Sequence, residues 1–207
     1  MNRKRRSGRA PKAPSQRRSP AARADLLARI SSGEAAAVFR VLLDRHPALR
    51  PEAEEIARAA VTDVRSEDLA DAVENAILGL DLDDLGARAG RHSDGYVEPT
   101  EAAWELLHEE LETFLEDMKR LVALGFEAAA VSTCEGIVLG LYRVRGKNSD
   151  QLLGWAEDFP AEGAGNALAT LARESAATHG RAWKLPERFV KAVPEWSTML
   201  QRAARPR

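Results

Sequence analysis

The stretch PTEAAWELLHEELETFLEDMKRLVALGFEAAAVSTCEGIVLGLY, residues 99–142, decides the fold class. Its first half places apolar side chains on one helical stripe and glutamates on the other faces. Pro99 suits the first turn of a helix, and Gly125 suits the residue after its end. We therefore expect a long amphipathic helix between them. Its apolar stripe consists of Trp104, Leu107, Leu111, Phe114, Leu115, Met118, Leu121 and Val122.

The second half, residues 126–142, is apolar on nearly every side, with Glu135 as the only charge in its interior. Such a helix belongs in a membrane or at the centre of a bundle, and its length and Glu135 favour the bundle. Gly136 and Gly140, four residues apart, would let a neighbouring backbone approach closely. The helices on either side of Gly125 should then form an antiparallel hairpin. The expected core contains Trp104, Leu107, Leu111, Phe114, Val131, Cys134, Ile137, Val138 and Leu141.

The composition of the whole chain agrees with an all-α fold. Leu, Ala, Glu and Arg dominate its 207 residues, whereas aromatic residues make up only 5%, which favours helices over strands. We expect at least seven helices and no sheet, packed as antiparallel hairpins in a bundle or a short α-solenoid. Residues 23–207 should form the all-α domain, either as one body or as two lobes divided near residues 86–98, where three glycines break the helical pattern.

Charge is distributed unevenly along the chain. Residues 1–23 hold nine Lys or Arg and no acid, residues 24–180 hold 14 basic and 30 acidic residues, and residues 181–207 hold seven basic and two acidic. Residues 1–22 have almost nothing to bury, which predicts a disordered basic arm. Its cations could neutralise nucleic-acid phosphates. These candidates are Arg3, Lys4, Arg5, Arg6, Arg9, Lys12, Arg17 and Arg18.

Other roles for the basic arm stay open. It could dock on an acidic protein face, keep the chain soluble or serve as a bipartite nuclear localisation signal. The acidic part of the chain should repel a polyanion, except along the basic C-terminal stretch. That stretch contains Arg181, Lys184, Arg188, Lys191, Arg202, Arg205 and Arg207.

One phrase occurs twice, as GEAAAV at residues 33–38 and as GFEAAAV at residues 125–131, each time at the start of an expected helix. A turning glycine, an early glutamate and small alanines suit two helices that close on each other. The phrase resembles the helix-to-helix junction of tetratricopeptide-like and related α-solenoid proteins, which implies helical hairpins. Residues 95–104 are also similar to uncharacterised bacterial helical proteins, which implies no activity.

The segment at residues 86–98 contains the best cluster of candidate binding residues. Arg88, Arg91, His92 and Tyr96, with Asp94 between them, place two guanidiniums, an imidazole and an aromatic ring on one connection. Guanidiniums make paired hydrogen bonds to phosphates and carboxylates, so the segment could recognise an acidic partner. The alternative is structural: Arg88 and Arg91 would pair with the aspartates of residues 81–84.

Two other groups of side chains are candidates for metal binding. Glu105 and His108 have the spacing of a di-iron ligand pair, but no second copy exists, so they should be solvated neighbours. Asp81, Asp83 and Asp84 lack a calcium-loop pattern and should cap a short helix.

Two residues of the apolar helix were weighed as reactive groups. Glu135 could be a desolvated acid with a raised pKa, but as a lone carboxylate it should lie on a wet edge or pair with an arginine such as Arg143. Cys134, the one cysteine, should be a small buried hydrophobe.

No complete catalytic, metal-ligand or nucleotide-binding motif is present, so we expect no cofactor and no catalytic residue. The expected function is a non-enzymatic helical module that binds another protein. A nucleic-acid-associated protein acting through its basic arm is the first alternative, and an enzyme or metal-binding bundle is the second. The N-terminal charge is not followed by the apolar stretch of a signal peptide, and no run of 18 apolar residues occurs, so a cytoplasmic protein without a membrane partner is expected.

Overall fold

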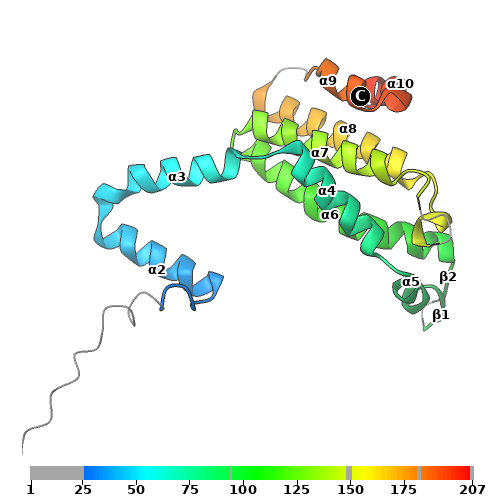
Figure 1. Cartoon of the computed structure of the whole chain (residues 1–207), viewed down its shortest axis with the longest axis horizontal. Coiled ribbons are helices and arrows are strands. Elements are labelled where there is room, and N and C mark those ends of the chain that lie inside the picture. The colour runs from blue at the N-terminus through cyan, green and yellow to red at the C-terminus, as the bar shows by residue number, and fades with distance from the viewer. Residues whose placement is uncertain (1–25, 94, 148–150, 181–182, 206–207) are drawn as a thin grey trace, which may run out of the picture. The chain divides into compact units, whose positions relative to one another are not determined.

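A computed structural model describes residues 26–93, 95–147, 151–180 and 183–205. These residues contain nine α-helices, and the all-α class is confirmed (Figure 1). The predicted arm, residues 1–22, lies outside the described residues. The chain divides between Glu55 and Ile56 into two compact units. No helix of the described residues is both long and apolar enough to cross a membrane.

The first helices are α2 (Ser32–Arg45), the short 3-10 helix η1 (Pro47–Leu49) and α3 (Arg50–Thr62). A capping box opens α2. The Glu34 carboxylate accepts a hydrogen bond from the Ser31 backbone N–H at 2.8 Å, and the Ser31 hydroxyl accepts one from the Glu34 N–H at 3.3 Å. Neither α2 nor α3 contains a buried residue.

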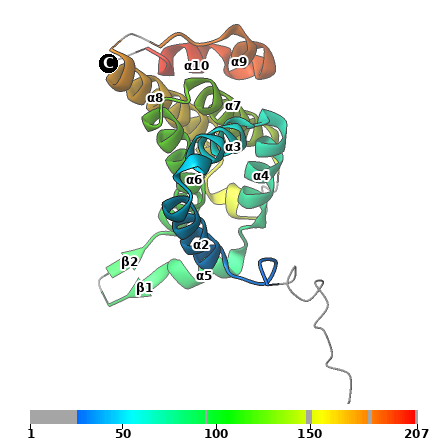
Figure 2. The ribbon, with the colours of Figure 1, turned by 90° about the vertical axis from the view of Figure 1, so that its left-hand side faces the viewer.

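The second unit is built around α4 (Ser66–Gly79), α6 (Pro99–Ala123), α7 (Glu127–Val144) and α8 (Phe159–His179). Figures 1 and 2 show these four helices side by side, and α7 packs against each of the other three. Helix α7 is the central element because nearly all of its faces are apolar, as the sequence predicted.

The predicted hairpin around Gly125 is confirmed. Gly125 has φ +81°, a conformation that glycine adopts without steric cost. The Phe126 N–H donates to the Leu121 carbonyl and the Gly125 N–H donates to the Val122 carbonyl, both at 2.9 Å. These two bonds satisfy carbonyls at the end of α6 and reverse the chain into α7.

Gly136 and Gly140 of α7 face α4, which confirms the predicted close approach. A Cβ at Gly140 would lie 2.7 Å from the Ala70 carbonyl oxygen, and one at Gly136 would lie 2.8 Å from the Ser66 carbonyl oxygen. Atoms cannot approach this closely without a shift of the backbone. The two glycines therefore set the distance between α4 and α7.

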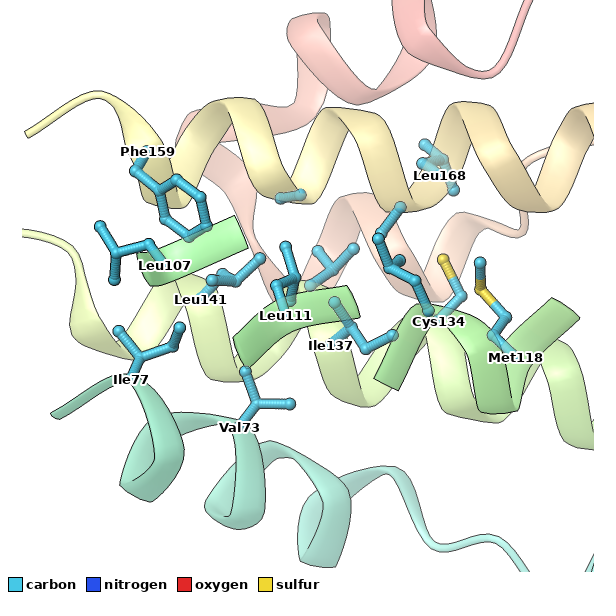
Figure 3. Close-up of a cluster of buried hydrophobic side chains, with 14 of the residues drawn as sticks. Val73, Ile77, Leu107, Leu111, Met118, Cys134, Ile137, Leu141, Phe159 and Leu168 are labelled. Atoms are coloured by element: carbon cyan, nitrogen blue, oxygen red, sulfur yellow. The ribbon is translucent and has the colours of Figure 1, made fainter. Parts of the chain in front are cut away.

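The core fills the space between these helices, where Leu107, Leu111, Ile137 and Leu141 are fully buried (Figure 3). Val131, Cys134 and Val138 are buried too, as predicted. Trp104 and Phe114 are only partly buried. The prediction for these two residues is corrected: they lie at the edge of the core, where the Trp104 ring meets the edge of Phe159 at 5.3 Å.

Smaller elements complete the second unit, and residues 86–98 lie within it. Helix α5 (Leu82–Arg88) leads into an antiparallel hairpin of β1 (Gly90–His92) and β2 (Gly95–Val97), in which Arg91 lies opposite Tyr96. The expectation of no sheet was therefore wrong. After α7 come the 3-10 helix η2 (Leu152–Trp155), α8, then α9 (Glu187–Ala192), the 3-10 helix η3 (Pro194–Trp196) and α10 (Ser197–Ala203).

Candidate functional site

Arg88 and Tyr96, two of the four predicted partner-binding residues, line one open hollow of about 760 Å³. Arg88 comes from the last turn of α5 and Tyr96 from β2, where it is 62% exposed. Arg91 is exposed and lies opposite Tyr96 in the ladder, and His92 pairs with Gly95 in the same ladder. The hairpin thus gathers these residues at one end of the bundle.

The Arg88 guanidinium is held by α6. Its two terminal nitrogens donate to the two carboxylate oxygens of Glu109 at 2.8 and 2.9 Å, and Glu105 lies 3.6 Å away. The hydrogen bonds from Arg88 hold the pKa of the Glu109 carboxyl below its ordinary value. The alternative that Arg88 pairs with the aspartates of residues 81–84 is corrected, because the carboxylates that it contacts here, Glu105 and Glu109, lie on α6. An incoming anion would have to displace Glu109, so this hollow is a weak anion site.

The aspartates before α5 act as a helix cap, as predicted. The Asp81 carboxylate accepts hydrogen bonds from the backbone N–H groups of Asp83 at 2.8 Å and Asp84 at 3.0 Å.

His108 packs its ring against Trp104 at 5.7 Å and Phe159 at 5.2 Å. In the part of the chain that the structure describes, no three His, Cys, Asp or Glu side chains are grouped so that they could hold a metal ion.

Glu135 of α7 pairs with Arg188 of α9, whose Nε lies 2.9 Å from the carboxylate. The expected partner, Arg143, was wrong: Arg143 bonds to Glu67 and Asp71 of α4 instead. The Glu135 side chain is only 16% exposed. Burial raises the pKa of Glu135, Arg188 opposes that shift, and the charge of Glu67 adds to it.

The nearby Cys134 is fully buried, and burial also raises the pKa of its thiol. The prediction of a small buried hydrophobe is confirmed.

Helix α2 presents an exposed apolar surface. Phe39 is 47% exposed and Leu42 is 43% exposed, and Val38 and Val41 are about as open. We call these four side chains, which belong to the unit that ends within α3, the α2–α3 apolar surface. They are spaced as the core-facing residues of an amphipathic helix would be, but about half of each is left open by the described chain. In α3, Ile56 of the second unit is 63% exposed.

A second surface feature is a groove of about 780 Å³ between α8 and α10. Figures 1 and 2 both show α10 alongside α8. Small residues of α8 form its floor, at intervals of four, four, three and four, and Met199 and Ala203 of α10 form its other side. The floor residues are Ala161, Gly165, Ala169, Ala172 and Ala176. Arg173, Arg202 and Arg205 also line the groove, and we call them the arginine rim.

The end of α7 holds the segment that leads into α10. The Arg145 guanidinium donates to both Glu195 carboxylate oxygens at 3.0 and 2.9 Å, and it lies 3.4 Å from the centre of the Tyr142 ring. The Tyr142 ring in turn meets the edge of Trp196 at 5.0 Å. These contacts fix η3 immediately before α10 and so place one wall of the groove.

The predicted nucleic-acid residues of the arm lie outside the described residues. Comparison with protein-family models, with curated proteins and with solved structures gave no match to this chain. The features of this chain that bear on function are therefore its own two surfaces, the α2–α3 apolar surface and the α8–α10 groove.

The α8–α10 groove is not predicted by the sequence. Two signals for it are present in the sequence: the basic C-terminal stretch and the spacing of small residues from Ala161 to Ala176. Neither signal shows that α10 returns to lie along α8, so the groove could only be found in three dimensions.

Proposed function

We propose that the chain is a non-enzymatic helical module that binds another protein through its α2–α3 apolar surface. One observation carries the proposal: helices α2 and α3 contain no buried residue, although both carry large apolar side chains. Contiguous exposed apolar surface on a soluble protein marks an interaction site more often than a structural accident.

The energetics of short helices support the same conclusion. An isolated helix of 14 residues, the length of α2, is marginal in water, because most helix stability comes from packing an apolar face. Covering one Phe or Leu side chain contributes roughly 1.5–3 kcal/mol. A partner that covers Phe39 and Leu42 would therefore stabilise α2 and gain affinity from the same contacts.

Capture of partners by the intact chain tests this proposal. The double substitution Phe39→Glu with Leu42→Glu places charge on the α2–α3 apolar surface, and Leu82→Glu, at a residue of α5 that is 47% exposed, is the matched control. After chemical cross-linking in lysate of the source cells, wild type and Leu82→Glu should retain the same proteins, and the double variant should lose them. Equal capture by all three chains, or no specific capture by wild type, would contradict the proposal.

The resemblance to tetratricopeptide-like proteins gives this proposal further support, because helical hairpins of that kind commonly present binding surfaces. It stays a prediction, as does the cytoplasmic location.

A second candidate function is nucleic-acid binding through residues 1–23, favoured by their nine basic residues and lack of acids. Deleting these residues should remove most binding to a duplex DNA or RNA probe and flatten its salt dependence, because each lost phosphate contact lowers the counterion-release slope by roughly one. Full binding by the shortened chain would contradict this role.

A further inference from the structure

We propose that the α8–α10 groove binds an acidic amphipathic helix of a partner protein. This surface is distinct from the α2–α3 apolar surface, and the inference does not depend on the proposed function. The shape of the groove, its floor and its charge support it.

The floor of the groove fits a helix better than a flat or extended ligand. Ala161 and Ala176 mark its ends, and 15 residues of helix span about 22 Å, or roughly four turns. Small side chains on one helix let a second helix approach closely, as the glycines of α7 do for α4. At Gly165, a Cβ would lie 3.2 Å from the Met199 sulfur, so α10 already approaches the floor closely at that point.

The charge of the groove is opposite to that of the protein around it. Residues 56–207 contain 17 basic and 26 acidic residues, a net charge of −9. The groove, in contrast, is lined by the three arginines of the rim and by one acid, Glu162. Arg173 donates to Glu174 at 3.2 Å, but its side chain is 66% exposed. Within the described ranges, Arg202 and Arg205 form no ion pair with a carboxylate.

This contrast determines which helix would bind. An acidic helix is repelled by most of the second unit and attracted at the arginine rim, which favours this groove over other surfaces. Guanidiniums also pair with carboxylates through two parallel hydrogen bonds, which would set the register of the bound helix. The partner should thus present alanine or leucine to the floor and glutamate or aspartate to the rim.

A pair of peptides tests the inference with the full chain. The probe is a labelled 15-residue helical peptide with alanine and leucine on one face and glutamates on both flanks. The control peptide has lysines in place of the glutamates. Binding is followed by fluorescence anisotropy with wild type, with the double variant Arg202→Glu and Arg205→Glu, and with Arg120→Glu. Arg120 lies on α6 and its side chain is 55% exposed, so that variant changes charge away from the groove.

Wild type and Arg120→Glu should bind the acidic peptide alike and discriminate against the basic one. The double variant should bind the acidic peptide at least about tenfold more weakly and should now prefer the basic peptide, because the rim charge has been reversed. Circular dichroism checks that all variants stay helical. A failure of wild type to bind the acidic peptide at about 1 mM would overturn the proposal. Unchanged preference in the double variant would overturn it equally.

Discussion

Helices α2 and α7 begin with nearly the same residues but lie in different surroundings. Helix α2 opens with Gly33-Glu34 followed by three alanines and a valine, and α7 opens with Glu127 followed by the same four residues. Eleven residues of α7 are buried, from Ala129 to Val144, whereas no residue of α2 is. The local sequence forms a helix in both places, but only α7 has neighbours that cover its apolar side chains.

The comparison shows what an apolar stripe does and does not predict. It predicts a helix with a face that must be covered, because exposed apolar area is unfavourable. It does not say whether the cover comes from the same chain or from a partner. In α7 the cover is α4, α6 and α8. In α2 we infer that it is another protein.

Truncation of one leucine in each helix should give the largest difference in stability between α7 and α2. Leu141→Ala in α7 removes a fully buried side chain and should lower the free energy of unfolding by about 3 kcal/mol. Leu42→Ala in α2 removes a side chain that is already 43% exposed, and its effect should stay within about 0.5 kcal/mol. Urea denaturation monitored by circular dichroism measures both values. Equal losses would show that α2 shares the core.

Adding a methyl group at a glycine should change stability differently at a packed site and at an open one. Gly140→Ala should destabilise the protein by about 2 kcal/mol, because the new Cβ collides with the Ala70 backbone and the helices must move apart. Gly86→Ala in α5 meets no atom within 4 Å and should be neutral or stabilising by up to about 1 kcal/mol, since alanine favours helix. Thermal unfolding of the two variants should shift in opposite directions. A harmless Gly140→Ala would mean that α4 and α7 are not in tight contact.

Replacing Glu135 or Glu109 with glutamine should change stability by a smaller amount. The two changes should have opposite signs at neutral pH. The folded-state pKa of Glu135 is raised by burial, so its contribution to stability is present below the ordinary glutamate pKa and is lost as pH rises through the folded value. Glu135→Gln should therefore exceed wild type in stability at neutral pH, and the gain should vanish in acid.

Glu109 is the matched control for this pH experiment. Its pKa is lowered by Arg88, so its contribution is present above the ordinary pKa and is lost as pH falls through the folded value. Glu109→Gln should then be less stable than wild type at neutral pH and equal to it in acid. Urea titrations between acid and neutral pH measure both differences. The same sign for both variants would contradict the assigned environments.

Much of the bundle was predictable because its signals are local or repeat along one helix. The stripe from Leu107 to Val122, the turn at Gly125 and the packing glycines of α7 each follow from spacing and residue size. The all-α class follows from composition. Trp104 and Phe114 were placed too deep, because periodicity gives the buried side of a helix but not the distance to its neighbour.

The remaining features depend on contacts between distant parts of the chain. Arg188 lies 53 residues after its partner Glu135, and no local pattern distinguishes it from Arg143 as the partner. The β1–β2 hairpin has three-residue strands, too short for an alternating pattern, although Gly90 and Gly95 both adopt positive φ at its ends. The α8–α10 groove requires that α10 lie along α8. The exposed state of Phe39 could not be predicted, because its spacing matches that of a core residue.

Hydrogen exchange of the intact chain, followed residue by residue in the absence of any partner, shows whether the chain itself covers α2 as it covers α7. We expect amides of α6, α7 and α8 to exchange only through global unfolding, because these helices surround the closed core. Amides of α2 and α3 should exchange with little protection, since no buried side chain holds them, and should gain protection when a partner binds. Protection of α2 equal to that of α7 in the isolated, monomeric chain would contradict the account.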